Sequence, residues 1–122
     1  MKIAASLPAA DIDRAKAWYA SILKLEPSKT DESGDVWYEL EGTRMLLYAS
    51  QFAGTNQATA AAFGVTDVEA TVAELRARGA KFEDYDFGEE FRTVDGILTT
   101  PDGQKAAWLK DSEGNILAIG PE

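Results

Sequence analysis

Two similar segments of this chain each follow an apolar, strand-like run and open an amphipathic helix. They span residues 7–15 and 63–71, and Asp11 and Asp67 occupy the same place in each. An aspartate at this position caps a helix by accepting a hydrogen bond from a free backbone N–H group. A chain that repeats a strand, a cap and a helix is predicted to consist of two similar halves.

The spacing of apolar residues predicts the remaining elements. In the first half we expect a strand over 2–7, a helix from Asp11 to about Leu23, a loop or weak edge strand over 27–34, and a hairpin of 36–40 with 44–49. In the second half we expect a strand over 60–65, a helix from Asp67 to Gly79, and strands over 93–99, 105–110 and 116–120. The predicted order of elements in each half is therefore β-α-β-β-β. This order predicts one α+β domain over 1–122, with module one at about 1–50, a connector at 51–59 and module two at about 60–122.

Composition narrows the functional classes. Twelve basic residues stand against 21 acidic ones, giving a net charge of −9, which disfavours nucleic acids and anionic membranes as partners. No apolar stretch approaches the roughly 20 residues of a membrane helix, and Met1 leads directly into a strand-like run rather than an export segment. The chain has no cysteine, which fits a reducing compartment. We expect a cytoplasmic protein.

The order of elements carries a family resemblance. Two β-α-β-β-β modules, an Asp-capped helix with the pair Trp18-Tyr19, and the turn 111–115 (Asp-Ser-Glu-Gly-Asn) before the last strand resemble the vicinal oxygen chelate superfamily. This superfamily contains glyoxalases, bleomycin resistance proteins and extradiol dioxygenases. The resemblance covers essentially the whole chain, although the family's Asp-Pro-x-Gly-Asn turn is altered at its second position. It implies a curved mixed sheet with a concave cup, whereas a generic ferredoxin-like domain would not explain the second copy.

The resemblance also says where metal ligands would stand. In metal-using relatives each half contributes one ligand from its first strand and one from its last. Counting from the capping aspartates and the turn glycines places these positions at Ala4, Ala60, Ala118 and Leu46, or at Tyr48 if the first hairpin is longer. A divalent metal site needs about four nitrogen, oxygen or sulfur donors, and the chain has neither histidine nor cysteine. We predict no metal, no cofactor, and none of the metal-dependent glyoxalase, dioxygenase or fosfomycin-transferase activities.

The same positions predict a binding cup. Alternation along the strands places small residues beside the former ligand positions, and a roomy apolar cavity is typical of small-molecule sites. Alternatively, small residues let a second chain or a large side chain pack closely. Trp18 is expected in the core, whereas the face presented by Trp37 and Trp108 stays open because one bulge would reverse it. The candidate binding residues are Ala4, Ser6, Trp37, Leu46, Tyr48, Ala60, Ala62, Trp108 and Ala118.

The segment 82–91 interleaves four aromatic residues with five acids. One interpretation is a lid that attracts a cationic, aromatic ligand through charge and cation–π contacts. The other is a solvated loop whose rings dock on the core while its acids face water.

Together these features predict a metal-independent protein that binds a small organic molecule, aromatic or cationic, as in the bleomycin-resistance branch. In that branch two chains pair, so the resemblance implies a homodimer. One alternative is a metal-free lyase, isomerase or hydrolase whose acid or base would be Tyr48, Glu39, Glu89 or Glu90. Another is an interaction module whose cup supports dimerisation. No catalytic residue is assigned.

Overall fold

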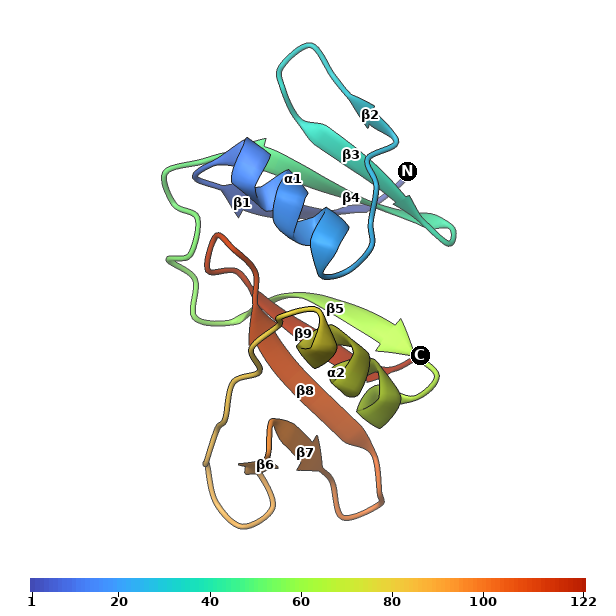
Figure 1. Ribbon diagram of the computed structural model, residues 1–122, viewed down its shortest axis with the longest axis vertical. Coiled ribbons are helices and arrows are strands. Elements are labelled where there is room, and N and C mark those ends of the chain that lie inside the picture. Colours follow the sequence, from blue (N-terminus) through green and yellow to red (C-terminus); the bar gives the residue numbers. More distant parts are fainter.

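A computed structural model describes residues 1–122 and arranges them as two sheets, each covered by one helix (Figure 1). Module one contains β1 (Ala4–Ala9), α1 (Ile12–Ser21), β2 (Lys29–Thr30), β3 (Val36–Leu40) and β4 (Thr43–Ala49). Module two contains β5 (Thr59–Val65), α2 (Val68–Ala77), β6 (Thr93–Val94), β7 (Ile97–Thr99), β8 (Lys105–Lys110) and β9 (Ile116–Pro121). The α+β prediction with two tandem modules is confirmed.

The two sheets have the same internal order. Sheet one runs β1-β4-β3-β2 and sheet two runs β5-β9-β8-β7-β6, with the first strand of each module parallel to the last. Both predicted helix caps are present: the Asp11 carboxylate accepts from the Arg14 backbone N–H at 3.0 Å, and Asp67 accepts from Ala70 at 3.0 Å. Each cap fixes where the chain leaves its sheet and turns into the covering helix.

One predicted strand is wrong. Residues 93–99 form a tight hairpin of β6 and β7 instead of a single strand. The turn is Asp95-Gly96, and both residues have positive φ, at 53° and 81°. Two successive residues with positive φ are the requirement of the commonest two-residue hairpin turn, in which Asp-Gly is a favoured pair. Module two therefore has one strand more than module one.

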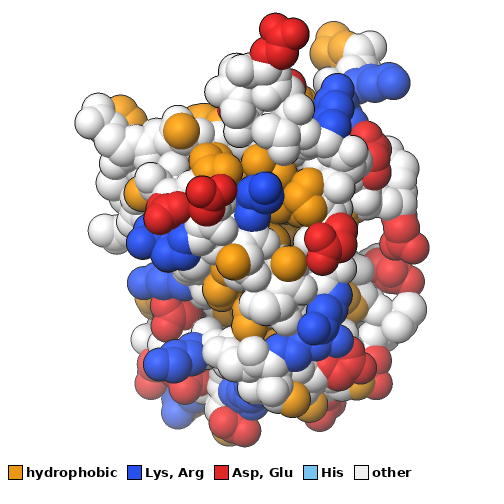
Figure 2. Space-filling model, turned by 45° about the horizontal axis from the view of Figure 1, so that its top comes forward, with side chains coloured by type: hydrophobic (Ala, Val, Ile, Leu, Met, Phe, Trp, Pro, Cys, Tyr) orange, Lys and Arg blue, Asp and Glu red, His pale blue; other side chains and the backbone are white.

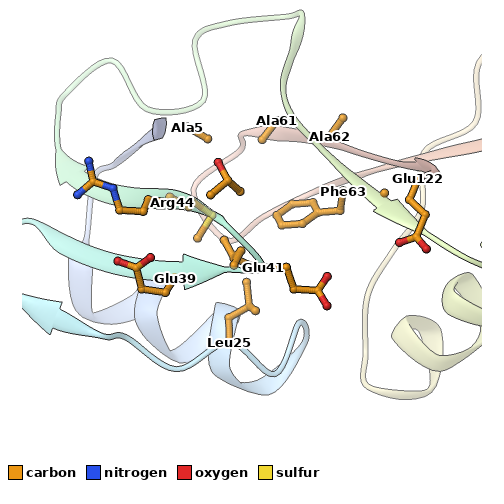
Figure 3. A pocket seen from close by; sticks show the side chains of 13 residues that line it. Ala5, Leu25, Glu39, Glu41, Arg44, Ala61, Ala62, Phe63 and Glu122 are labelled. Atoms are coloured by element: carbon orange, nitrogen blue, oxygen red, sulfur yellow. The ribbon is translucent and has the colours of Figure 1, made fainter. Parts of the chain in front are cut away.

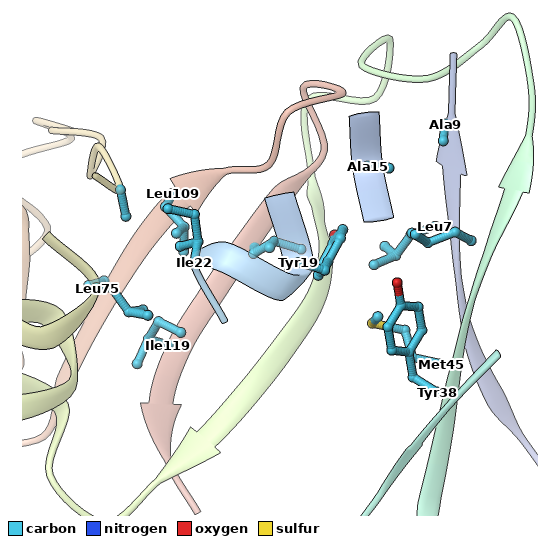
Figure 4. Packing of buried hydrophobic residues seen from close by; sticks show 14 of the residues in the cluster. Leu7, Ala9, Ala15, Tyr19, Ile22, Tyr38, Met45, Leu75, Leu109 and Ile119 are labelled. Atoms are coloured by element: carbon cyan, nitrogen blue, oxygen red, sulfur yellow. The ribbon is translucent and has the colours of Figure 1, made fainter. Parts of the chain in front are cut away.

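The core lies between the sheets and the helices. A cluster of 17 buried residues draws on both modules, including Tyr19 of α1, Leu75 of α2, and Leu109 and Ile119 of sheet two (Figure 4). Trp18 is half-buried and packs against this cluster. Since alternate residues of each strand point into the core, the intervening residues point to the opposite face of each sheet.

A polar network joins the modules at the turn 111–115. Glu113 accepts hydrogen bonds from the Arg14 side chain at 2.8 and 3.0 Å and from the Asp11 backbone N–H at 2.9 Å. Tyr19 of α1 donates to Asp111 at 2.6 Å. The bonds that Glu113 accepts lower its pKa to about 2, chiefly through the hydrogen bond from Arg14. The start of α1 is thereby held against the last turn of module two.

The surface carries charges of both signs. Figure 2 shows acidic and basic side chains spread over one face, with apolar side chains reaching the surface between them. None of the helices is both long and apolar enough to cross a membrane.

Candidate functional site

Five predicted binding residues lie on the face of sheet one that points away from α1, here called the open face of module one. Ser6 pairs with Leu46 across the parallel ladder, and Leu46 pairs with Trp37 across the antiparallel one. Residues paired across strands share a face. Ala4 and Tyr48 lie on this same face, because each is two residues along its strand from Ser6 or Leu46. Their role in ligand binding remains a prediction.

Trp37 is held in place on this face. Its indole Nε1 donates to the Asp31 carboxylate at 3.0 Å, and the Arg44 guanidinium lies 4.7 Å from the ring centroid. The ammonium of Lys29 lies 5.8 Å from the same centroid. Hydrogen bonds from Ser33 and Trp37 lower the pKa of Asp31 to about 2. The indole of Trp37 is therefore already engaged in cation–π contacts within its own module.

In module two, Trp108 pairs with Ala118, and Ala118 pairs with Ala62. These three residues share the face of sheet two that points away from α2, here called the open face of module two. The registers of β3 and β8 run without a shift, so both tryptophans point away from the helices. Ala60 differs from the other candidates, since it lies at a bulge where the register of β5 shifts between Thr59 and Ala61, and it is exposed.

A cavity of about 370 Å³ lies over the open face of module two, and we call it the aromatic pocket. The Tyr85 ring meets Trp108 edge-on, with centroids 5.8 Å apart, and Phe87 stacks on Tyr85 at 5.8 Å. Phe91 completes the ring wall. Leu98 and Ile116 also line the cavity, and Gln57 and Thr59 add polar groups. This volume and mixture are typical of sites for small organic molecules.

The segment 82–91 therefore combines parts of both interpretations. Phe82 packs against the core, but Tyr85, Phe87 and Phe91 line the aromatic pocket, and Phe87 and Phe91 remain 78% and 61% exposed. Large apolar rings left in solvent beside a cavity are candidates for ligand contact. Most of the rings thus stand at the pocket rather than in the core.

Two acids of this segment, Glu83 and Asp84, make contacts within the protein. Glu83 forms an ion pair with Lys110 at 3.3 Å. The Asp84 carboxylate accepts from the Thr93 hydroxyl at 2.7 Å and from the Gly96 N–H at 2.8 Å, and these bonds lower its pKa. None of the five acids lines the aromatic pocket. In this structure, Asp84 stabilises the loop, and the rings form the pocket.

Backbone hydrogen bonds pin the loop as a short hairpin. The Phe87 N–H donates to the Phe91 carbonyl at 2.9 Å, and the Thr93 N–H donates to the Tyr85 carbonyl at 2.8 Å. The backbones of Asp86 and Arg92 form an isolated antiparallel β-bridge between these two pairs. The ring wall is therefore presented by a structured loop.

The structure does not gather the nine predicted residues in one cavity. Only Trp108 lines the aromatic pocket, and Ala62 lines a different cavity between the modules. The aromatic pocket also uses residues outside the predicted set. These are Gln57, Ala58, Thr59, Tyr85, Phe87, Phe91, Leu98 and Ile116. The interleaved rings of 82–91 were the available sequence signal for three of them.

The candidate acids and bases are likewise dispersed. Glu39 lines the cavity between the modules, whereas Glu89 lies in a polar groove with Arg92 and Lys105. Neither lines the aromatic pocket, and nor does Tyr48 or Glu90. No group of three or more His, Cys, Asp and Glu side chains is arranged to hold a metal ion. The residues at the positions implied by the resemblance thus do not fit a metal centre.

The duplicated strand–helix–sheet modules with an open face on each sheet define a two-module α+β protein of the glyoxalase/bleomycin resistance type. The family model described as the Glyoxalase-like domain matches residues 3–115, and the chain belongs to this family. This finding confirms the resemblance to the vicinal oxygen chelate superfamily.

Solved structures agree on the fold. The chain is similar to a lactoylglutathione lyase from Agrobacterium tumefaciens, with a TM-score of 0.74, 18% identity, and coverage of 99% of this chain and 92% of the other. It is similar to a glyoxalase/bleomycin resistance protein from Catenulispora acidiphila, with a TM-score of 0.73, 22% identity, and coverage of 100% and 98%. It is also similar to a bleomycin resistance determinant encoded on transposon Tn5, with a TM-score of 0.72, 14% identity, and coverage of 100% and 98%. A comparison with curated proteins gives no match.

Proposed function

We propose that this protein binds a small aromatic organic compound in the aromatic pocket without a metal ion and without changing the compound chemically. The observation that carries the proposal is the set of rings around the cavity: Trp108 from β8 and Tyr85, Phe87 and Phe91 from the pinned loop. Flat rings offer a large stacking area and lose little conformational entropy on binding. The similarity to a bleomycin resistance determinant supports a role in binding a small molecule.

Metal independence is part of the proposal. Its support is the donor chemistry of the chain, because alanine and leucine stand at four of the positions that the family resemblance assigns to ligands. The lack of cysteine fits a reducing compartment and supports a cytoplasmic location.

Replacing Phe87 by alanine is expected to weaken binding of quinoline, a neutral aromatic probe, by about tenfold, which corresponds to about 1.4 kcal/mol. The titration is followed through the indole N–H signal of Trp108 in nitrogen-15 NMR spectra. The matched control is Phe52→Ala, because Phe52 is similarly exposed, at 66%, but lies outside the pocket. A chelator is expected to leave quinoline binding unchanged. Equal affinity of both variants, or binding abolished by the chelator, contradicts the proposal.

The proposed assembly is a homodimer. Its support is the open face of module one, where Trp37, Leu46 and Tyr48 remain partly exposed. Sedimentation equilibrium is expected to give the mass of two chains. Leu46→Arg is expected to shift that mass toward one chain, because it places a charge in the partly apolar interface between the two chains. The mass of a single chain for the unmodified protein contradicts this part of the proposal.

A further inference from the structure

A second and larger cavity, of about 740 Å³, lies where the two modules meet, and we call it the seam cleft (Figure 3). One wall is the end of the β3–β4 hairpin, and the other is the outer edge of β5, which pairs with β9 on one side only. Ala5 and Ala61 lie where the walls approach each other in Figure 3. The cleft shares no lining residue with the aromatic pocket.

The floor of the seam cleft is apolar. Leu25, Leu40 and Phe63 are partly buried and pack against the core, and Met45 belongs to it. These side chains come from both modules, so the floor is the place where the shared core reaches the surface. An apolar ligand body placed here would bury surface on two modules at once.

The rim of the cleft is acidic. Glu39, Glu41 and Glu122 line it together with a single cation, Arg44. None of the three carboxylates takes part in an ion pair or accepts a side-chain hydrogen bond. Arg44 pairs with Glu39 across the β3–β4 ladder and shares its face, so the charges without a cationic neighbour are those of Glu41 and Glu122. In a concave, partly apolar site the field of uncompensated charges is focused and attracts a counter-ion.

Glu41 stands in an unusual backbone conformation at this rim. Its φ is 36° and that of Gly42 is 89°, so the two residues form a hairpin turn with positive φ at both positions. Asn, Asp and Gly are the residues that such a turn favours, and glutamate is not among them. The conformation carries the Glu41 side chain into the cleft (Figure 3).

We propose that the seam cleft is a second binding site, and that its ligand is a small organic cation with an aliphatic body and one ammonium group. The aliphatic body lies on the floor formed by Leu40, Met45 and Phe63, and the ammonium lies at the rim near Glu41 and Glu122. The volume falls within the range of cavities that hold small organic molecules. Recognition of rings and recognition of charge are thereby assigned to separate sites in this chain.

The test uses three probes of the same chain length: hexylammonium, hexanol and hexanoate. Hexylammonium is expected to shift the backbone amide signals of Gly42 and Gly64 and to bind about tenfold more tightly than hexanol. Hexanoate is expected to give no shift there. Glu41→Gln is expected to weaken hexylammonium binding several-fold, whereas Glu32→Gln, an equal change of charge on an exposed loop away from the cleft, leaves it unchanged. Glu122→Gln provides an independent second variant.

Each outcome decides the proposal. The expected order of the three probes together with the loss on Glu41→Gln supports it. Equal binding of hexylammonium and hexanol, shifts confined to Trp108 and Phe87, or no shift at Gly42 and Gly64 overturns it. Concentration-dependent shifts of Gly42 and Gly64 in ligand-free protein also overturn it, because they mean that a second copy of the chain covers the cleft. None of these results depends on whether quinoline binds in the aromatic pocket.

Discussion

Acidification from pH 5 to pH 2 is expected to remove on the order of 3 kcal/mol of stability through Glu113 alone. The side chain of Glu113 is completely buried, and it accepts hydrogen bonds from Arg14, Ser112 and the Asp11 backbone. The hydrogen bond from Arg14 is the largest cause that lowers the pKa of Glu113 from its ordinary 4.5 to about 2.

The direction of this effect follows from which state takes up the proton first. Above pH 4.5 the Glu113 carboxylate is ionised in both states, and the folded protein stabilises the ionised form. As the pH falls toward 2, the unfolded chain is protonated before the folded one, so the stabilisation is lost over this window. Asp31, whose pKa is lowered from 3.8 to about 2, adds to this acid loss only below about pH 3.8.

A substitution separates Glu113 from the other carboxylates. Urea unfolding of Glu113→Gln at pH 7 is expected to give a lower free energy of unfolding than the parent protein, and the two curves are expected to converge near pH 2. The matched control is Glu74→Gln, because Glu74 makes only an exposed pair with Arg78 at 3.8 Å, and such pairs contribute little. Parallel pH profiles of the parent and Glu113→Gln would contradict the assignment.

The fold was predictable because its determinants are local. Asp11 and Asp67 precede their helices directly, and the alternation along 44–49 correctly separates core residues from those on the open face. The error at 93–99 has a local cause too, since the Asp95-Gly96 pair is a hairpin signal within an apolar run. The bulge beside Ala60 leaves no comparable mark in the sequence, because it depends on the pairing of β5 with β9.

The site was less predictable because its walls come from distant segments. Alternation places Trp108 on one of two faces, but only the ladder to Ala118 decides which one. The aromatic residues of segment 82–91 are evident in the sequence. Their position over β8, however, depends on contacts such as the hydrogen bond from the Glu83 N–H to the Trp108 carbonyl. The seam cleft is formed by residues of both modules, so no pattern within either module predicts it.

Removing the hydroxyl group from one of two buried tyrosines is expected to lower the free energy of unfolding, whereas removing it from the other is not. Tyr19 and Tyr38 are 0% and 1% exposed, and their ring centroids lie 6.2 Å apart in the same core. The Tyr19 hydroxyl donates to the Asp111 carboxylate at 2.6 Å, whereas the Tyr38 hydroxyl has no hydrogen-bond partner. A bond to a charged acceptor contributes about 1.5–3 kcal/mol, so Tyr19→Phe is expected to lower the free energy of unfolding by about 2 kcal/mol.

Tyr38→Phe is the matched control, because it makes the same chemical change a few ångströms away. Burial raises the pKa of Tyr38 to about 12, and an unpaired hydroxyl held there imposes a desolvation penalty that phenylalanine does not have. Tyr38→Phe is therefore expected to leave stability unchanged or to raise it by up to about 1 kcal/mol. Urea unfolding measures both variants, and the indole N–H signal of Trp18, whose ring meets Tyr19 edge-on at 4.9 Å, reports in NMR spectra whether the core stays intact. Equal losses would mean that a buried water satisfies Tyr38, and a larger loss for Tyr38→Phe would contradict the role given to Asp111 as the acceptor that joins the two modules.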